Sequence, residues 1–284
     1  MRADPNQRVK DLFDLTGRVA IITGGAGLLG YHHGAILAAA GASVVLLDLA
    51  HANPALRAEQ LQLAHGPECL GLSADITSEQ SLAEARDQIL EKFGRIDILI
   101  NNAANNPKVE TKDGATSQAW SRLENLPLHI WNEDINVGLT GAFLCARTFG
   151  AQMVRQNSGV IVNVASDLAL IAPDQRLYRK EGLPEDLQPV KPVTYSVVKT
   201  ALIGLTRYLA TYWTAHNIRV NAISPGGVSA GQPEDFTAKL HQLIPLGRMA
   251  HKDEYQGAIL FLCSDASSYM TGANLVIDGG RSCL

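Results

Sequence analysis

The sequence has no excess of basic residues and no long apolar run. Its net charge of −4 supplies no basic field that would attract a nucleic acid. No apolar stretch reaches the roughly 18 residues that a membrane-spanning helix needs, and residues 1–10 are polar rather than signal-like. We therefore expect a cytoplasmic protein that binds neither nucleic acid nor a membrane.

Residue patterns for a metal site or a disulfide framework are also missing. The neighbours His32 and His33 point to different sides of a helix and lack the spacing of metal ligands. The four cysteines are isolated from one another, which argues against a Cys-x-x-Cys site and against a set of disulfides. We predict no metal and reduced thiols.

Near the N-terminus, a strand, a glycine-rich turn and a helix follow one another. Residues 18–23 form a short apolar run, residues 24–30 read Gly-Gly-Ala-Gly-Leu-Leu-Gly, and an alanine-rich helix is expected through about Ala40. Small residues let the backbone approach a pyrophosphate, and the first N–H groups of the helix attract its negative charge. Such a run alone also fits a tight turn without a ligand, but its place between strand and helix favours a dinucleotide site. The predicted cofactor contacts here are Gly24, Gly27, Leu28, Leu29 and Gly30.

The second apolar run, residues 43–48, ends in Asp48. A carboxylate at this place accepts hydrogen bonds from the ribose hydroxyls of NAD and repels the extra phosphate of NADP. No Lys or Arg lies in the glycine turn or between Asp48 and Asn53 to neutralise that phosphate. The sequence therefore predicts NAD(H) as the cofactor.

Three residues further along the chain predict proton transfer coupled to hydride transfer. Ser166 follows an apolar run, and Tyr195 and Lys199 form a Tyr-x-x-x-Lys pair. Residues four apart share one face of a helix, so the Lys199 ammonium is expected to lower the pKa of Tyr195. A tyrosine tuned in this way acts as an acid or base near neutral pH.

These features, in this order, resemble the short-chain dehydrogenase/reductase family from about Leu12 to Gly280. Further matching segments are Asp75-Ile76, residues 101–104 (Asn-Asn-Ala-Ala), residues 221–226 (Asn-Ala-Ile-Ser-Pro-Gly) and residues 278–280 (Asp-Gly-Gly). The resemblance implies that Asn136 is an active-site residue that holds a water next to Lys199, with Ser166 and Tyr195 completing the catalytic set. It also implies cofactor contacts from Asp75, Ile76, Asn102, Ala103, Ala104, Tyr195, Lys199, Pro225, Gly226 and Val228.

The chain also departs from the family pattern. Leu28 stands where classical members have the middle glycine of the turn, and this spacing is similar to that of extended members. Ala230 stands where the family often has a threonine that contacts the nicotinamide carboxamide. In addition, 28 residues separate Ser166 from Tyr195, more than is usual in the family. We interpret the chain as a classical body with an atypical phosphate loop.

Alternating strand-like and helix-like segments predict an α/β fold. We expect one NAD-binding Rossmann-type domain over residues 1–284, a doubly wound parallel sheet of about seven strands with helices on both faces. Loop insertions are expected near residues 105–128 and 171–192. A lid, by resemblance, is expected near residues 227–246.

The predicted function is an NAD-dependent oxidoreductase that interconverts a secondary alcohol and a ketone, on a polar carbohydrate-like or hydroxy-acid substrate. A 3-oxoacyl thioester reductase is the competing enzyme hypothesis, and a non-catalytic cofactor-binding scaffold protein is a third. Within residues 171–192, Arg176 and Arg179 either bind an anionic or hydroxylated substrate or pair with acidic residues of the same loop. The resemblance also implies a dimer or tetramer, formed through helices near residues 130–156 and 194–216 and the C-terminal strands.

Overall fold

The computed structural model describes residues 5–105 and 120–284, and the strands in this part of the chain form one parallel sheet. The sheet is seven-stranded and its order is β3-β2-β1-β4-β5-β6-β7. The strands are β1 (Val19–Thr23), β2 (Ser43–Asp48), β3 (Cys69–Ser73), β4 (Ile98–Asn101), β5 (Gly159–Val164), β6 (Ile218–Pro225) and β7 (Asn274–Ile277). This order, with β1 and β4 at the centre, confirms the predicted Rossmann-type sheet.

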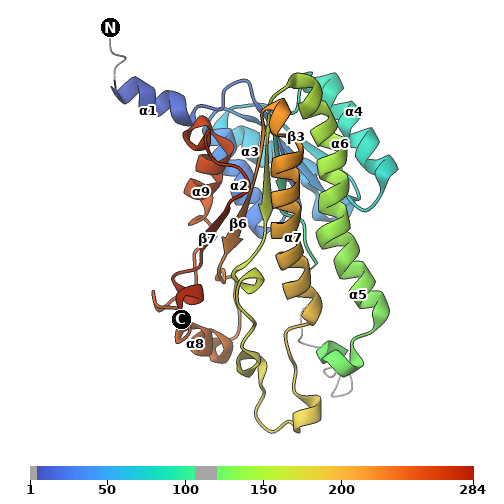
Figure 1. Cartoon of the computed structure of the whole chain (residues 1–284), viewed down its shortest axis with the longest axis vertical. Coiled ribbons are helices and arrows are strands. Elements are labelled where there is room, and N and C mark those ends of the chain that lie inside the picture. The colour runs from blue at the N-terminus through green and yellow to red at the C-terminus, as the bar shows by residue number, and fades with distance from the viewer. Residues whose placement is uncertain (1–4, 106–119) are drawn as a thin grey trace.

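Helices cover both faces of the sheet. One face carries α4 (Glu79–Phe93), α6 (Gly141–Gln156) and α7 (Val193–Tyr212), and the other carries α2 (Leu28–Ala39), α3 (Pro54–His65) and α9 (Gln256–Cys263). Figure 1 shows α6 and α7 on the opposite side of the sheet from α2 and α9. The remaining helices are α1 (Pro5–Phe13), α5 (Leu128–Ile135) and α8 (Glu234–His241).

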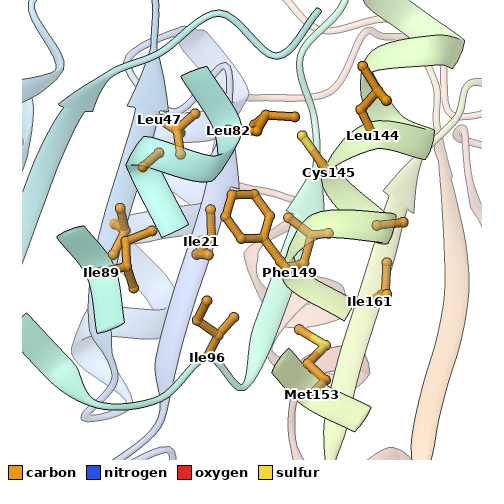
Figure 2. Close-up of a cluster of buried hydrophobic side chains, with 14 of the residues drawn as sticks. Ile21, Leu47, Leu82, Ile89, Ile96, Leu144, Cys145, Phe149, Met153 and Ile161 are labelled. Carbon is orange, nitrogen blue, oxygen red and sulfur yellow. The ribbon is translucent and has the colours of Figure 1, made fainter. Parts of the chain in front are cut away.

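The central strands are apolar throughout because both of their faces are buried. Every residue of β1 and β4 is buried, as a strand between two helical layers requires. Ile21 of β1 lies beside Val45 of β2 and Leu99 of β4 in the sheet register. On the face covered by α6, the Phe149 ring packs near Ile21 and Ile161 (Figure 2).

The helix predicted near residues 130–156 is broken at Asn136. It consists of α5, a π-helical turn η4 (Asn136–Thr140), and α6. Such single π turns are frequent at functional sites because they displace backbone groups from the helical repeat. The second long helix agrees with the prediction more closely: α7 is followed by a short 3-10 turn, η8 (Thr214–His216).

The segment from residue 171 to 192 contains two 3-10 turns, η6 (Gln175–Tyr178) and η7 (Glu185–Leu187). Leu177 and Tyr178 of η6 pack against α8 and the loop after it in a separate apolar cluster, whose other members are Phe236, Leu240, Leu243, Ile244 and Met249. The segment therefore lies against residues 227–246 below the carboxyl end of the sheet (Figure 1). Of the expected insertion near 105–128, residues 106–119 lie outside the described part, and residues 123–125 form the 3-10 turn η3 (Leu123–Asn125).

Several short 3-10 turns complete the described structure: η1 (Ala50–Ala52), η5 (Asp167–Ala169), η9 (Asp265–Ser267) and η10 (Arg281–Cys283). No helix in the described residues is long and apolar enough to cross a membrane.

Candidate active site

The glycine turn packs tightly against the end of β4. Gly24 has a φ of +60°, and a Cβ added there would lie 2.9 Å from the Cα of Ala103. A Cβ on Gly30 would lie 2.2 Å from the carbonyl oxygen of Gly24, so neither position tolerates a side chain. Gly27 is the N-cap of α2 and Leu28 its first residue. The turn thus presents backbone N–H groups and the positive end of α2 at the sheet edge, as a pyrophosphate requires.

Asp48 lies beside this turn, at the end of β2. Its carboxylate accepts hydrogen bonds from the backbone N–H groups of Ala26, at 3.0 Å, and Leu49, at 2.8 Å. These two bonds fix the carboxylate next to the glycine turn. A carboxylate held there fits the ribose of a dinucleotide whose pyrophosphate lies on α2.

Other predicted cofactor residues lie along the same edge. Asn102 donates from its side chain to the carbonyl oxygens of Thr23 and Gly24, and the Thr23 hydroxyl accepts from the backbone of Asn102 and Ala103. This network holds the β4 end against the glycine turn. Asp75 accepts from the backbone and hydroxyl of Thr77, in a turn before α4.

On the other side of the sheet centre, the predicted contacts after β6 are held by β7 and α9. Gly226 donates its N–H to the Ile277 carbonyl, and its own carbonyl accepts from the Tyr255 hydroxyl at 3.1 Å. Pro225 ends β6, and Val228 forms a bridge with Ala250. The predicted residues Leu29, Ile76 and Ala104 also lie at or near the carboxyl edge, and Ile76 is buried against Gly141. The described residues therefore fit a nicotinamide dinucleotide along this edge.

Ser166 is buried at the end of β5, and its hydroxyl forms hydrogen bonds within the protein. Its Oγ donates to Oδ1 of Asp167 at 2.8 Å and accepts from the N–H of Leu168 at 3.2 Å. Oδ2 of Asp167 accepts from Arg281 at 2.8 Å, and both partners of this ion pair are more than nine-tenths buried. Sequence reasoning missed Asp167 and Arg281. They stand next to predicted motifs, but nothing in the sequence shows that the two residues meet.

Tyr195 lies beside Ser166, and its environment differs from the prediction. Burial raises the pKa of Tyr195 above its usual value, a hydrogen bond with Ser166 lowers it in part, and the Asp167 charge raises it further. The predicted lowering of this pKa is therefore wrong for the protein without cofactor. Desolvation of the phenolate outweighs the other influences.

Lys199 is fully enclosed behind Tyr195. Its Nζ donates to the carbonyl oxygen of Val164 at 2.7 Å and lies 5.8 Å from the centre of the Tyr195 ring. Burial lowers the pKa of Lys199 to about 8, and repulsion from Lys191 contributes. Asn136 is exposed on the π-helical turn, and no hydrogen bond joins its side chain to Lys199 within the described residues.

A second ammonium group lies over the Tyr195 ring. Nζ of Lys191 is 3.9 Å from the centre of the Tyr195 ring, closer than Lys199. Burial lowers the pKa of Lys191 to about 8, while Asp134 and Asp167 act to raise it. Sequence reasoning did not single out Lys191 as a site residue. Its position four residues before Tyr195 places it at the entry to α7.

The structure shows internal pairing for Arg176 and Arg179. Arg176 donates to both carboxylate oxygens of Asp174, and Arg179 forms an ion pair with Glu185. To bind a substrate, either guanidinium would have to leave its carboxylate. The insertion instead places Tyr178 near the site: burial raises the pKa of Tyr178 to about 12, with smaller effects from Arg281, Tyr195 and Asp167.

Taken together, these residues place the Tyr195 hydroxyl and the amino groups of Lys191 and Lys199 at the same carboxyl edge of the sheet as the glycine turn. A cavity between the β4 end and α7 is lined by Ala104, Asn105, Asp134, Gly138, Tyr195 and Lys199, among others. Such a site is suited to moving a proton on or off an oxygen while a nicotinamide exchanges a hydride with the attached carbon.

Comparison with known proteins gives consistent matches over nearly the whole chain. A family model described as short chain dehydrogenase matches residues 18–177, and one described as Enoyl-(Acyl carrier protein) reductase matches residues 186–282. The chain is 33% identical over 276 residues to the NAD-dependent glycerol dehydrogenase of Listeria innocua serovar 6a, covering 94% of this chain and 95% of that protein. It is 31% identical to the 3-oxoacyl-[acyl-carrier-protein] reductase FabG of Aquifex aeolicus, covering 94% and 98%.

A solved structure shows the same fold. The gluconate 5-dehydrogenase from Burkholderia cenocepacia J2315, in complex with NADP and tartrate, superposes with a TM-score of 0.83 at 26% identity. The superposition covers 97% of this chain and 99% of that one.

Proposed function

Because the chain belongs to the short-chain dehydrogenase/reductase family, we propose that it interconverts a secondary alcohol and a ketone with NAD(H). The observation that carries this proposal is the meeting of Ser166, Tyr195 and Lys199 at the same carboxyl edge of the sheet as the glycine turn, although they come from two different elements of the chain. A scaffold that only bound the cofactor would not need a tyrosine between a buried serine and a buried lysine.

In this proposal, Tyr195 exchanges a proton with the substrate oxygen. The cofactor, when bound, accepts the hydride during oxidation and supplies it during reduction. For reduction, Tyr195 already holds the required proton, because its pKa is raised. For oxidation it must first lose that proton, so the oxidation rate is expected to increase with pH. The Nζ of Lys199 is held by its hydrogen bond to the carbonyl oxygen of Val164 and places positive charge near the Tyr195 ring.

We propose NAD rather than NADP because of Asp48. The carboxylate is held at the end of β2 by two backbone N–H groups, next to the glycine turn. A 2′-phosphate would meet this negative charge, whereas a free ribose hydroxyl would donate to it. The glycerol dehydrogenase relative uses NAD, while the gluconate 5-dehydrogenase structure contains NADP, so the choice depends on the residues of this chain.

A polar substrate, such as a polyol, sugar acid or hydroxy acid, is the class we favour. The insertion at residues 171–192 and the α8 segment, which we propose to be the lid, border the site with polar and aromatic side chains such as Tyr178 and Lys191. The names of the glycerol and gluconate enzymes agree with this class. The resemblance to FabG keeps a 3-oxoacyl thioester as the second candidate substrate.

One absorbance screen tests these alternatives. NADH or NADPH formation is followed with polyols, sugars, sugar acids and hydroxy acids, and NADH or NADPH consumption with a 3-oxoacyl thioester. We expect turnover with NAD and a hydroxylated substrate. Turnover only with NADPH and the thioester would favour the second candidate. A protein that binds NADH but turns over none of these substrates would favour the scaffold hypothesis.

We also propose that the protein is a homo-oligomer, a tetramer or a dimer, located in the cytoplasm. The outer face of α7 exposes Tyr208 and Tyr212, which stack on each other with ring centres 5.6 Å apart. Phe143 on α6 is also exposed. Large apolar side chains on two adjacent helices are typical of a surface that is covered by a second subunit.

A further inference from the structure

We propose that the buried Asp167–Arg281 ion pair is a positioning device that holds the Ser166 hydroxyl beside Tyr195 and couples the C-terminal turn to catalysis. The inference deepens the proposed function and rests on it, because it takes Tyr195 as the group that exchanges the proton. Neither Asp167 nor Arg281 belongs to the residues that the sequence predicted for the site.

The contacts form a continuous chain from the C-terminal turn to the catalytic tyrosine. Arg281 donates to Oδ2 of Asp167 at 2.8 Å, and Oδ1 of Asp167 accepts from Ser166 Oγ and from the Leu168 N–H, both at 2.8 Å. Each carboxylate oxygen therefore has a donor, and the carboxylate has little freedom to rotate. Ser166 in turn lies close enough to Tyr195 to lower the pKa of the tyrosine. The orientation of the serine hydroxyl is thus fixed by the Asp167 carboxylate.

Arg281 is held in place by the turn that carries it. Asp278 accepts from the backbone N–H groups of Gly280, at 2.9 Å, and Ser282, at 2.7 Å, on both sides of Arg281. Gly279 adopts a φ of +68°, where a Cβ would lie 2.7 Å from Ile244 of the segment after α8. The Leu246 N–H donates to the Gly279 carbonyl. The turn therefore connects the α8 segment to the arginine that reaches Asp167.

The Asp167–Arg281 ion pair also sets the electrostatic environment of Tyr195. The Asp167 carboxylate raises the pKa of Tyr195, and Arg281 supplies the compensating positive charge. A buried carboxylate without its partner would repel the phenolate more strongly. Several other charged and titratable groups interact with Tyr195, with the ion pair or with their charged neighbours: Asp134, Asp174, Tyr178, Lys191, Lys199 and Tyr255.

These contacts predict shifts of opposite sign in two variants. Asp167→Asn removes the negative charge, so the midpoint at which Tyr195 loses its proton is expected to fall by about one pH unit. Arg281→Met leaves the carboxylate uncompensated, so the midpoint is expected to rise by a similar amount. The double variant removes both charges and is expected to lie between the two. Arg281→Lys retains the charge and should remain closest to the unaltered protein.

Two independent measurements test the proposal. The first is the pH dependence of kcat/KM for alcohol oxidation in each variant. The second is a direct titration of Tyr195 by NMR of isotope-labelled tyrosine Cζ, with the signal assigned by its loss in Tyr195→Phe. The titration needs no substrate. If it shows the opposite shifts while no substrate turns over, the effect of the ion pair on Tyr195 is confirmed and the proposed function fails.

Arg219→Met is the matched control for general destabilisation. Arg219 is a partly buried arginine near the opposite end of β6, where it donates to the Ser264 carbonyl and the Ser267 hydroxyl. It should lower thermal stability without moving the Tyr195 midpoint. If the Arg281→Met variant does not fold, the Tyr195 midpoint of Asp167→Asn is compared with that of the double variant instead. Midpoints that stay within about 0.2 pH units of the unaltered protein, or that shift in the same direction in both single variants, would overturn the proposal.

Discussion

The most quantitative prediction concerns acid stability and depends on His33 in α2. Its imidazole is 1% exposed, and neither ring nitrogen has a hydrogen-bond partner within the described part of the chain. Burial lowers the pKa of His33 from 6.5 to about 3, with a small contribution from His32. The folded protein therefore keeps His33 neutral at a pH where the unfolded chain protonates it.

The sign and size of the effect follow from linkage. Above pH 6.5 both states are neutral at this position and His33 has no effect on pH dependence. As the pH falls from 6.5 towards about 3, the unfolded state binds the extra proton and the free energy of unfolding decreases. Each pH unit in that window costs about 1.4 kcal/mol, so His33 alone should remove about 2 kcal/mol between neutral pH and about pH 5.

Urea unfolding of the unaltered protein and of His33→Leu, at about pH 7.5 and about pH 5, measures this difference. The Leu variant should lose about 2 kcal/mol less on acidification, and it should not be less stable at pH 7.5, because no hydrogen bond is lost. His65→Leu is the control, since His65 is exposed at the end of α3. An identical loss of stability in His33→Leu and in the unaltered protein would refute the assignment.

Three further predictions concern the cofactor, the insertion and the assembly. Asp48→Ala should weaken NAD binding about tenfold or more in calorimetry and narrow the preference over NADP, because a charged hydrogen bond to the ribose is lost; tighter binding of NADP than NAD by the unaltered protein would contradict this. Arg176→Ala and Arg179→Ala should each change KM by less than about twofold, since exposed ion pairs contribute little, and a large rise in KM would instead assign them to the substrate. Light scattering should give a multiple of 30.5 kDa, and replacing both Tyr208 and Tyr212 with Glu should reduce that mass; a 30.5 kDa species for the unaltered protein would refute the oligomer.

The sequence was sufficient to predict the fold and the elements that meet at the site. Apolar runs such as residues 43–48 coincide with strands because central parallel strands are buried on both faces, which leaves a clear composition signal. The glycine turn and the order of Ser166, Tyr195 and Lys199 were likewise recognised directly from residue types and their spacing in the sequence. What the sequence did not predict depends on tertiary contacts.

Two examples show this limit. The pKa of Tyr195 was expected to fall because Lys199 is four residues away, but burial of the ring, which only the folded structure reveals, outweighs that charge. Arg281 lies 114 residues from Asp167, and no local pattern links them. The sequence left two roles open for Arg176 and Arg179, because either an acidic residue of the same loop or a substrate could bind the guanidinium groups. The structure shows both arginines paired with acidic residues.

The central claim is that Tyr195 exchanges the proton while the cofactor exchanges the hydride. Tyr195→Phe tests it most directly, with NADH binding measured by fluorescence and alcohol oxidation measured by NADH absorbance. We predict that the variant binds NADH within about twofold of the unaltered protein while kcat falls at least about a hundredfold, because only the proton-transferring hydroxyl is removed. A Phe variant that keeps a substantial part of the turnover would contradict the assigned role of Tyr195.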